Sequence, residues 1–427
     1  MMKIDQHHAL DRLTSGGLHP TLALPASLND NLSIKMASTE STPRSRYEKI
    51  EVAYILGAGF SRNAGLPLQS QFTDELLRAR GLKRGPSKTL VHFLCRFVRE
   101  AFDHSEKAHA EYWPALEDIF TCIDLSANTG HHLGFKYPPS LLRTTRRALI
   151  ARIAKMLHST YEKSRERRTV QWQLLVRFFK AINVSRSAFI NMNWDTVVED
   201  QLTSIYGDEL RFTYGGSAIP ADFPTTSNDS EPIELRRPHG EVVRLVKMHG
   251  SVNWLYCDNC RRLFWFLPGE AMKVANQALT DAEWKIICST IGTPETHRAS
   301  NWTCCYCNGV RLGGRIATFS YRKALDFAMF QRAWSEAERS LRQAKTWVFI
   351  GYSLPAADYE FKYLLKRVEL SRNPPPNYIM IAKDEPPQET STYRNYQRFF
   401  GRSIKIGKSA FLEGLNAGAI KSLRDLY

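Results

Sequence analysis

A short apolar run that ends in a glycine-rich turn places the strongest constraint on this chain. Residues 52–56 are predicted to form a buried strand, and Gly57 and Gly59 follow it directly. Glycine lets the backbone turn sharply and come close to a ligand, and helical spacing begins after Pro67. A strand, a glycine turn and a helix start together present backbone N–H groups to a phosphate. An ordinary tight turn is the alternative, because Arg62 stands where the G-x-G-x-x-G fingerprint needs its third glycine.

Strands alternate with helices along most of the chain. Further strands are predicted at residues 187–192, 242–248, 347–350 and 378–382, and a long helix is predicted at 323–344. This alternation indicates an α/β fold, in which a Rossmann-type parallel sheet is covered by helices on both faces.

Three segments stand apart from that pattern. Residues 1–46 are rich in Ser, Thr, Pro, Asn and Asp and lack periodicity, so we expect a flexible N-terminal arm. Residues 47–427 are then one domain, with a helical insertion at about 83–185 and a small cysteine-bearing module at about 254–316. The helices of the insertion are predicted at 87–102, with Ser87 as the N-cap, at 112–125 and at 141–161.

Four predicted strands end at residues that could form a site. Gly57, Asn193, His249 and Gly351 each lie just past a strand's C-terminal end, and ligands of open α/β sheets bind outside those ends. A histidine suits a general base at neutral pH, and an asparagine amide can hold a water or a carboxamide. Asp195 could bind ribose hydroxyls, or it could cap the following helix. The ordinary alternatives are a histidine bonded to a loop and an asparagine that stabilises a turn.

The chain of 427 residues carries a net charge of +15. This charge suits an anionic ligand, nucleic acid or an acidic partner, but a general role in solubility explains it equally well. One side of the helix predicted at 141–161 is basic, either as a solvated face or as a contact to nucleic acid or a partner; its members are Arg146, Arg147, Arg152 and Lys155. No apolar run approaches the roughly 20 residues that span a bilayer, and the N-terminus lacks a signal pattern. We therefore expect a cytoplasmic protein without membrane contact.

Two cysteine pairs have the spacing of a zinc ribbon. Cys257 and Cys260 are separated by two residues, and so are Cys304 and Cys307. In a reducing compartment such a cluster suggests a metal site before it suggests disulfides, and four thiolates would hold a structural Zn²⁺. The gap between the pairs exceeds the usual ~15–20 residues, so free cysteines in a loop are the alternative. Cys305 is expected to be a bystander.

Four motifs, in this order, resemble those of the sirtuin family. They are Gly57-Ala58-Gly59-Phe60-Ser61 with Gly65-Leu66-Pro67, then Asn193-Trp194-Asp195, then His249-Gly250, and then Gly351-Tyr352-Ser353-Leu354. The resemblance extends from about Val52 to Ala382 and is closest to the divergent sirtuin-like domains of bacterial defence proteins. In those domains a Gly-Tyr-Ser-Leu-Pro segment followed by an aspartate, here Asp358, is typical. Sirtuins also carry two cysteine pairs after the catalytic His-Gly.

The resemblance implies a domain that binds NAD and breaks the bond between nicotinamide and ribose. The residues that it implies fall into three groups: the pyrophosphate would contact Gly57, Ala58, Gly59 and Ser61; the nicotinamide ribose would meet Asn193 and Asp195; and the adenosine side would meet Gly351 and Ser353. Asn193 and His249 would be catalytic, with His249 as the base. Nicotinamide departs neutral from a pyridinium, so the reaction needs an oriented ribose and a positioned water rather than a general acid.

An NAD glycohydrolase that depletes NAD in antiphage defence is the function that this resemblance favours. Deacylases of the family continue Gly-Ile-Pro with Asp-Phe-Arg, whereas Leu68-Gln69-Ser70 follows Pro67 here, which makes water the expected acceptor. The alternatives are a protein deacylase or ADP-ribosyl transferase, and a non-catalytic subunit that binds NAD or ADP-ribose. The expected partners are NAD, other copies of this chain and, by analogy with related defence systems, an ATPase or sensor encoded nearby.

Overall fold

The computed structural model describes residues 48–427 with the exception of 80, 104–112, 217, 226–230, 295–296, 300–301, 308–311, 315–327, 383–389 and 402–410. The predicted arm at 1–46 and the first part of the helix expected at 323–344 lie outside the described residues. Within the described ranges, no helix combines the length and the apolar character needed to cross a bilayer.

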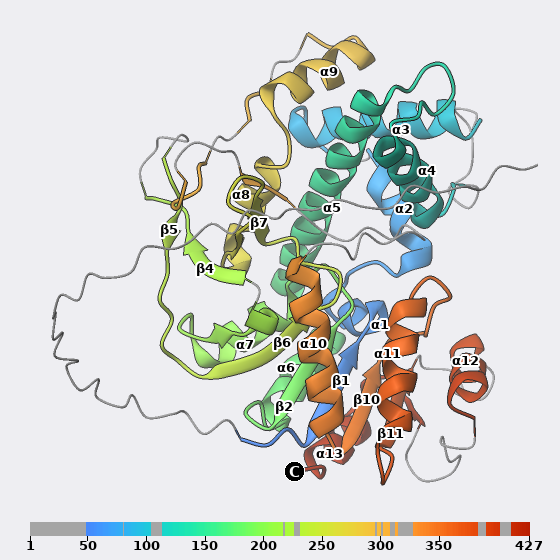
Figure 1. Cartoon of the computed structure of the whole chain (residues 1–427), viewed down its shortest axis with the longest axis vertical. Coiled ribbons are helices and arrows are strands. Elements are labelled where there is room, and N and C mark those ends of the chain that lie inside the picture. The colour runs from blue at the N-terminus through green and yellow to red at the C-terminus, as the bar shows by residue number, and fades with distance from the viewer. Residues whose placement is uncertain are drawn as a thin grey trace, which may run out of the picture. The chain divides into compact units, whose positions relative to one another are not determined.

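A seven-stranded parallel sheet forms the centre of the domain, in the order β12-β11-β10-β1-β2-β6-β3 (Figure 1). Its strands are β1 (Val52–Leu56), β2 (Ser187–Asn191), β3 (Arg211–Phe212), β6 (Val242–Lys247), β10 (Thr346–Ile350), β11 (Asn377–Ala382) and β12 (Phe411–Glu413). The predicted parallel α/β sheet is confirmed. The strands β3 and β12 escaped prediction because two or three residues are too few to show a period.

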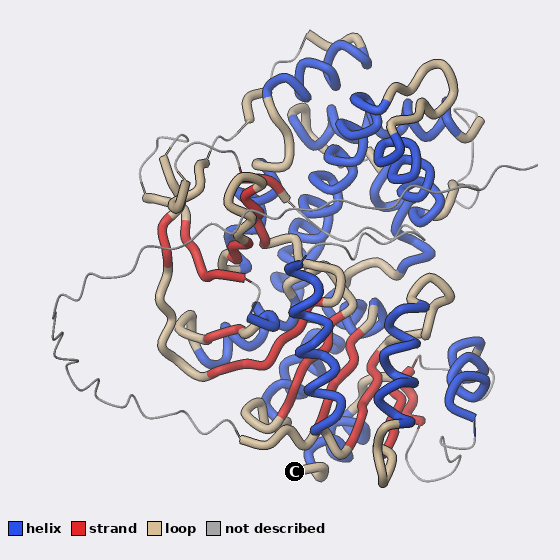
Figure 2. Tube along the Cα trace, viewed as in Figure 1, coloured by secondary structure: helices blue, strands red, loops and turns tan. Residues whose placement is uncertain are grey.

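Helices cover both faces of this sheet. Along β1, Val52, Tyr54 and Leu56 contribute to one apolar core and Ala53 and Ile55 to the other, as the alternation of a strand requires. The first core is completed by α6 (Val170–Ala181), α7 (Val197–Tyr206) and α13 (Ala417–Arg424), and the second by α10 (Ala328–Gln343), α11 (Tyr359–Leu370) and α12 (Ser391–Phe400). Figure 2 shows the strands enclosed between these helices. Burial on both faces explains why β1 is apolar throughout.

Between β1 and β2 the described residues are mainly helical, and the boundaries of the insertion at about 83–185 stay a prediction. They form α1 (Ala58–Ser61), α2 (Gln69–Leu77), α3 (Pro86–Ala101), α4 (Leu116–Thr129), α5 (Pro139–Arg167) and α6. The prediction of Ser87 as an N-cap is wrong: Gly85 is the N-cap of α3, because Pro86 takes the first helical position, where its fixed φ suits the helix and its missing N–H costs nothing. The helix α5 extends beyond the predicted 141–161, since its last turns are too polar to show an apolar period.

A second, five-stranded sheet carries the cysteine pairs, in the order β5-β4-β8-β7-β9. Its strands are β4 (Ala218–Asp222), β5 (Glu234–Leu235), β7 (Trp254–Cys257), β8 (Leu263–Trp265) and β9 (Leu312–Gly313), and the helices α8 (Ala271–Asn276) and α9 (Asp281–Ile291) follow β8. The sheet therefore takes β4 and β5 from chain that precedes the predicted module. Short strands from separate segments leave no continuous pattern in the sequence.

The basic side predicted for the long helix does not form one exposed face. Arg152 and Lys155 are only 5% and 6% exposed, and the Nε of Arg152 donates to the carbonyl oxygen of Leu76 at 3.0 Å. Arg146 pairs with Asp124 at 2.7 Å. Both interpretations of this side, a solvated face and a contact to nucleic acid or a partner, are therefore wrong for Arg152 and Lys155, because tertiary packing covers that part of α5.

Lys155→Met is expected to stabilise the protein at pH 7. Burial, with the charge of Arg152 adding to it, lowers the pKa of Lys155 from 10.5 to about 8. Between the folded-state pKa of about 8 and the unfolded-state pKa of 10.5, the unfolded chain binds more protons than the folded chain, so the free energy of unfolding rises with pH. Below pH 8 Lys155 is charged in both states, and the folded protein bears the full cost of burying that charge. We expect the free energy of unfolding to increase by about 2 kcal/mol at pH 7, and by less at pH 10, in denaturant titrations. Lys163→Met, on the exposed side of α5, is the control, and a loss of stability in Lys155→Met at pH 7 would contradict the prediction.

Candidate active site and metal centre

The carboxyl ends of four adjacent strands meet at one edge of the main sheet. The strands are in register there, because Leu56 pairs with Ile350 on one side and with Asn191 on the other, and Asn191 pairs with Lys247. The predicted residues that follow these ends therefore lie in the spatial order Gly351, Gly57, Asn193, His249. Between β1 and β10 the chain reverses its direction of travel through the sheet, and such switch points are where open α/β sheets bind ligands.

Three of the predicted glycines pack directly against one another. The N–H of Gly59 donates to the carbonyl oxygen of Gly351 at 2.9 Å. A Cβ on Gly57 would lie 2.6 Å from that same oxygen, and a Cβ on Gly351 would lie 2.2 Å from the backbone nitrogen of Phe60. The close packing of the two turns therefore explains by itself why glycine occupies these three positions. The contact of these glycines with a pyrophosphate stays a prediction.

Asn193 joins the glycine turn to the turn after β2. Its Nδ2 donates to the carbonyl oxygen of Gly57 and to the Oγ of Ser61, both at 2.8 Å. The Oγ of Ser61 in turn donates to the Oδ2 of Asp195 at 2.7 Å, and the Oδ1 of Asp195 accepts the N–H of Val197 at 3.1 Å. Asp195 thus bonds the first residue of α7, although Thr196 is the N-cap of that helix, and it connects α7 to the glycine turn.

His249 belongs to the same set of strand-end contacts. Its Nδ1 lies 3.1 Å from the carbonyl oxygen of Met192, the residue before Asn193. A carbonyl oxygen only accepts, so Nδ1 carries the hydrogen, and the lone pair of the neutral ring lies on Nε2. That Nε2 lies 3.7 Å from the Oδ1 of Asp358, and the imidazole is almost fully buried.

A buried ion pair stabilises the turn after β2. Lys247, at the end of β6, is fully buried; its Nζ donates to the carbonyl oxygen of Asp195 and lies 3.5 Å from the carboxylate of Glu199. The hydroxyl of Tyr214 donates to the same carboxylate at 3.1 Å. Burial raises the pKa of Glu199, although the charge of Lys247 opposes that shift.

The remaining predicted residues lie at the same edge with different exposure. Ala58 begins α1 and is half-buried, whereas Ser353 is exposed and its carbonyl oxygen accepts the Nδ2 of Asn395 at 3.1 Å. Nothing in the described contacts joins Ser353 to Asn193 or His249. The assignment of Ala58 to the pyrophosphate and of Ser353 to the adenosine side stays a prediction.

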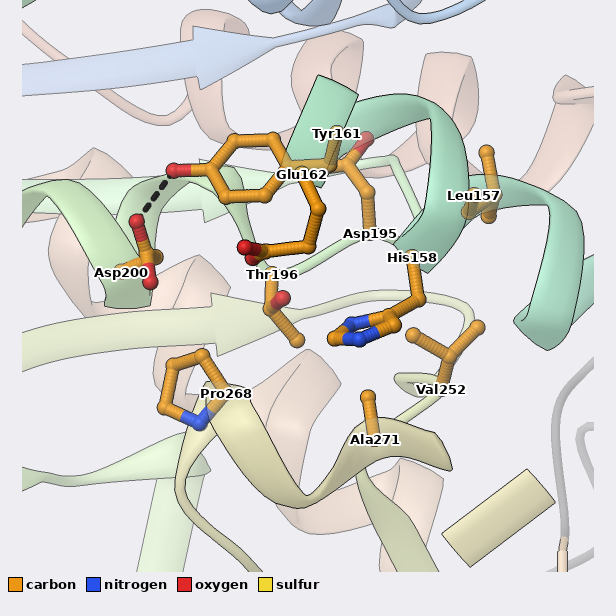
Figure 3. A pocket seen from close by; sticks show the side chains of 10 residues that line it. All are labelled: Leu157, His158, Tyr161, Glu162, Asp195, Thr196, Asp200, Val252, Pro268 and Ala271. Atoms are coloured by element: carbon orange, nitrogen blue, oxygen red, sulfur yellow. Dashed lines mark hydrogen bonds between the residues drawn. The ribbon is translucent and has the colours of Figure 1, made fainter. Parts of the chain in front are cut away.

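Asp195 also lines a small cavity (Figure 3). It measures about 10 Å³, which is room for about one water molecule. The imidazole of His158 points into it near Val252 and Ala271, and Tyr161 donates a hydrogen bond to Asp200 at its edge. Burial raises the pKa of Asp200. A dinucleotide does not fit in this space.

Four cysteine sulfur atoms converge in the second sheet. The Sγ atoms of Cys257, Cys260, Cys304 and Cys307 all lie within 4.8 Å of one another, with Cys257 and Cys307 at 3.5 Å and Cys260 and Cys304 at 3.6 Å. A tetrahedral zinc site with Zn–S bonds of about 2.3 Å has S–S edges of about 3.8 Å, so the donor set fits Zn²⁺. Cys305 does not belong to this set, and its assignment as a bystander stays a prediction.

Cys257→Ser is expected to remove a structural zinc ion. We expect about one zinc per chain in the parent protein by elemental analysis, and a large loss in the variant, because a serine oxygen is a poor substitute for a thiolate. Thermal unfolding should show a less stable module. Cys305→Ser is the matched control and should retain zinc; a metal-free parent protein that remains folded would contradict the assignment.

No protein-family model and no curated protein matches this chain. One solved structure that aligns with it is described as "The Structural basis of Sirtuin Substrate Affinity". The alignment covers 83% of this chain and 95% of that chain, at 13% sequence identity and a TM-score of 0.32. A structural likeness with so low a TM-score does not identify the function of this chain.

Sequence reasoning missed the buried residues behind the strand ends. Lys247 left one signal, since a lysine at the end of a strand that is otherwise apolar except for Arg244 is unusual, and its partner Glu199 lies on a different element. In the sequence, only the family resemblance points to Asp358. Its contact with His249 joins two segments that are far apart along the chain, so no local pattern predicts it.

Proposed function

We propose that this protein is an NAD⁺ glycohydrolase that cleaves the bond between nicotinamide and ribose and gives nicotinamide and ADP-ribose. One observation carries the proposal. The amide of Asn193 donates to the carbonyl oxygen of Gly57 in the glycine turn, and the imidazole of His249 contacts the carbonyl oxygen of Met192, the residue before Asn193. Carboxamide, imidazole and glycine turn, remote in sequence, therefore meet where open α/β sheets bind ligands.

The chemistry requires few groups. Nicotinamide leaves with the bonding electron pair and neutralises its own pyridinium charge, so the sugar carbon becomes oxocarbenium-like without a general acid. Water then forms the new C–O bond, and His249 takes the proton from that water. Asn193 would hold the ribose or the water in line with the bond that breaks. The dinucleotide would lie over the strand ends, since the cavity beside Asp195 holds only about one water.

The full-length protein incubated with NAD⁺ tests this proposal. Chromatography should show nicotinamide and ADP-ribose in equal amounts, either from the protein alone or with the product of a neighbouring gene. Release of nicotinamide that depends on an acetylated peptide would instead favour the deacylase, and transfer to protein would favour the ADP-ribosyl transferase. Binding of NAD without turnover, with every partner present, would favour the non-catalytic subunit.

NAD depletion in antiphage defence is the biological outcome that we propose for this activity. It is supported by the motif resemblance alone, as are an oligomeric state and an ATPase or sensor partner. The cytoplasmic location expected from the sequence stays a prediction. Nucleic-acid contact through the basic surface has less support, because Arg152 and Lys155 are buried. Plaque counts on cells that carry the gene or its His249→Ala form would test this role.

A further inference from the structure

Asp358 occupies a helix-capping position but does not cap its helix. It is the N-cap residue of α11, where an aspartate side chain ordinarily accepts a backbone N–H of the first turn. Here the carboxylate makes no such bond. It is 7% exposed and points to other partners in the interior, so its position is set by tertiary contacts rather than by the helix.

Two of those partners are a tyrosine and the imidazole of the proposed site. The hydroxyl of Tyr352 donates to the Oδ2 of Asp358 at 2.9 Å, which leaves Oδ1 directed at the Nε2 of His249, 3.7 Å away. Burial, with the charge of Asp358 adding to it, raises the pKa of Tyr352 well above its ordinary value, so its phenol remains a donor. Tyr396 holds this segment in turn, because its hydroxyl donates to the carbonyl oxygen of Tyr352 at 2.8 Å.

The imidazole therefore has an acceptor near each nitrogen, one at hydrogen-bond distance and the other 3.7 Å away. The carbonyl oxygen of Met192 accepts at Nδ1, and a carboxylate faces Nε2. The other charged groups of the strand ends are paired among themselves: Lys247 with Glu199, and Asp195 with Ser61 and the start of α7. Asp358 is thus the carboxylate placed to stabilise a positive charge on this ring.

We propose that Asp358 is a positioning residue that stabilises the imidazolium of His249 that forms during NAD cleavage, whereas the carbonyl oxygen of Met192 selects the tautomer with its hydrogen on Nδ1. The expected change in kcat rests on the proposed hydrolysis of NAD, whereas the pairing of Asp358 with His249 does not depend on it. As water adds to the sugar carbon, its proton moves to Nε2 of His249, and the ring gains a positive charge 3.7 Å from the Oδ1 of Asp358. The proton later leaves to solvent, and Asp358 stays ionised throughout.

Asp358→Asn tests the inference by two independent readouts. In kinetics, we expect kcat to fall by about 10- to 1,000-fold with little change in the KM for NAD⁺, because the amide keeps the shape but loses the charge. In NMR of histidine-labelled full-length protein, the imidazolium signal of His249 should disappear at a pH about one unit or more lower than in the parent. His249→Gln assigns that signal. Asp425→Asn, at an exposed carboxylate, is the matched control.

Tyr352→Phe keeps the inference testable if Asp358→Asn does not fold. It removes only the hydroxyl that orients the carboxylate, so both readouts should move in the same direction by a smaller amount. Folded Asp358→Asn with an unchanged His249 titration, or with full kcat, would overturn the inference. If the parent protein does not cleave NAD, the titration still decides whether Asp358 and His249 are coupled, so failure of the proposed function and failure of the pairing are distinguishable.

Discussion

His249→Ala and Asn193→Ala are each expected to reduce NAD cleavage by at least about 100-fold. A general base contributes about 10²- to 10⁴-fold, and the alanine variant lacks the imidazole that would take the proton from water. Asn193→Ala removes the amide that joins Gly57 and Ser61, so the position of the ribose or the water would no longer be fixed. Initial rates of nicotinamide release at saturating NAD⁺ measure both effects.

Folding must be separated from chemistry in these variants. Asn193→Ala loses two hydrogen bonds, so circular dichroism and thermal unfolding should accompany the rates. His92→Ala, an exposed histidine on α3, is the matched control and should keep full activity. If both site variants are folded and cleave NAD at the parent rate, the assignment of the site is wrong.

Gly351→Ala is expected to destabilise the protein by at least about 4 kcal/mol or to prevent folding. Gly351 has a φ of +60°, a region that costs a residue with a Cβ about 1–2 kcal/mol. The larger effect comes from contact, since the added Cβ would lie 2.2–2.4 Å from backbone atoms of Gly59 and Phe60. Backbone at the end of a buried strand cannot move aside cheaply, so the two turns would separate.

Gly269→Ala is the control for that prediction. A Cβ at Gly269 meets nothing within 4 Å, and its φ lies outside the left-handed region, so we expect a change below about 1 kcal/mol. Denaturant titration, or the soluble yield if Gly351→Ala does not fold, compares the two. A Gly351→Ala protein as stable as the Gly269→Ala protein would show that the turns after β1 and β10 are not packed as described.

Local sequence pattern predicted the elements that contain enough residues to show a period. The strand at 52–56 and the helices α2 and α7 follow from apolar side chains whose spacing matches a strand or a helix. The cysteine pairs could be recognised in the same way, because ligand spacing is a property of a short stretch. By contrast, Ser87 failed as a cap because the neighbouring proline determined where the helix begins.

The sequence by itself determined which residues stand at strand ends and which pairs of cysteines could share a metal. Only the tertiary structure decided that β10, β1, β2 and β6 are neighbours in register, and hence that Asn193 contacts Gly57 and that Asp358 faces His249. It also buried Lys155, which an amphipathic pattern would leave in water. The reason is physical: a periodic pattern tells which side of an element is apolar, but not which distant segment packs against it.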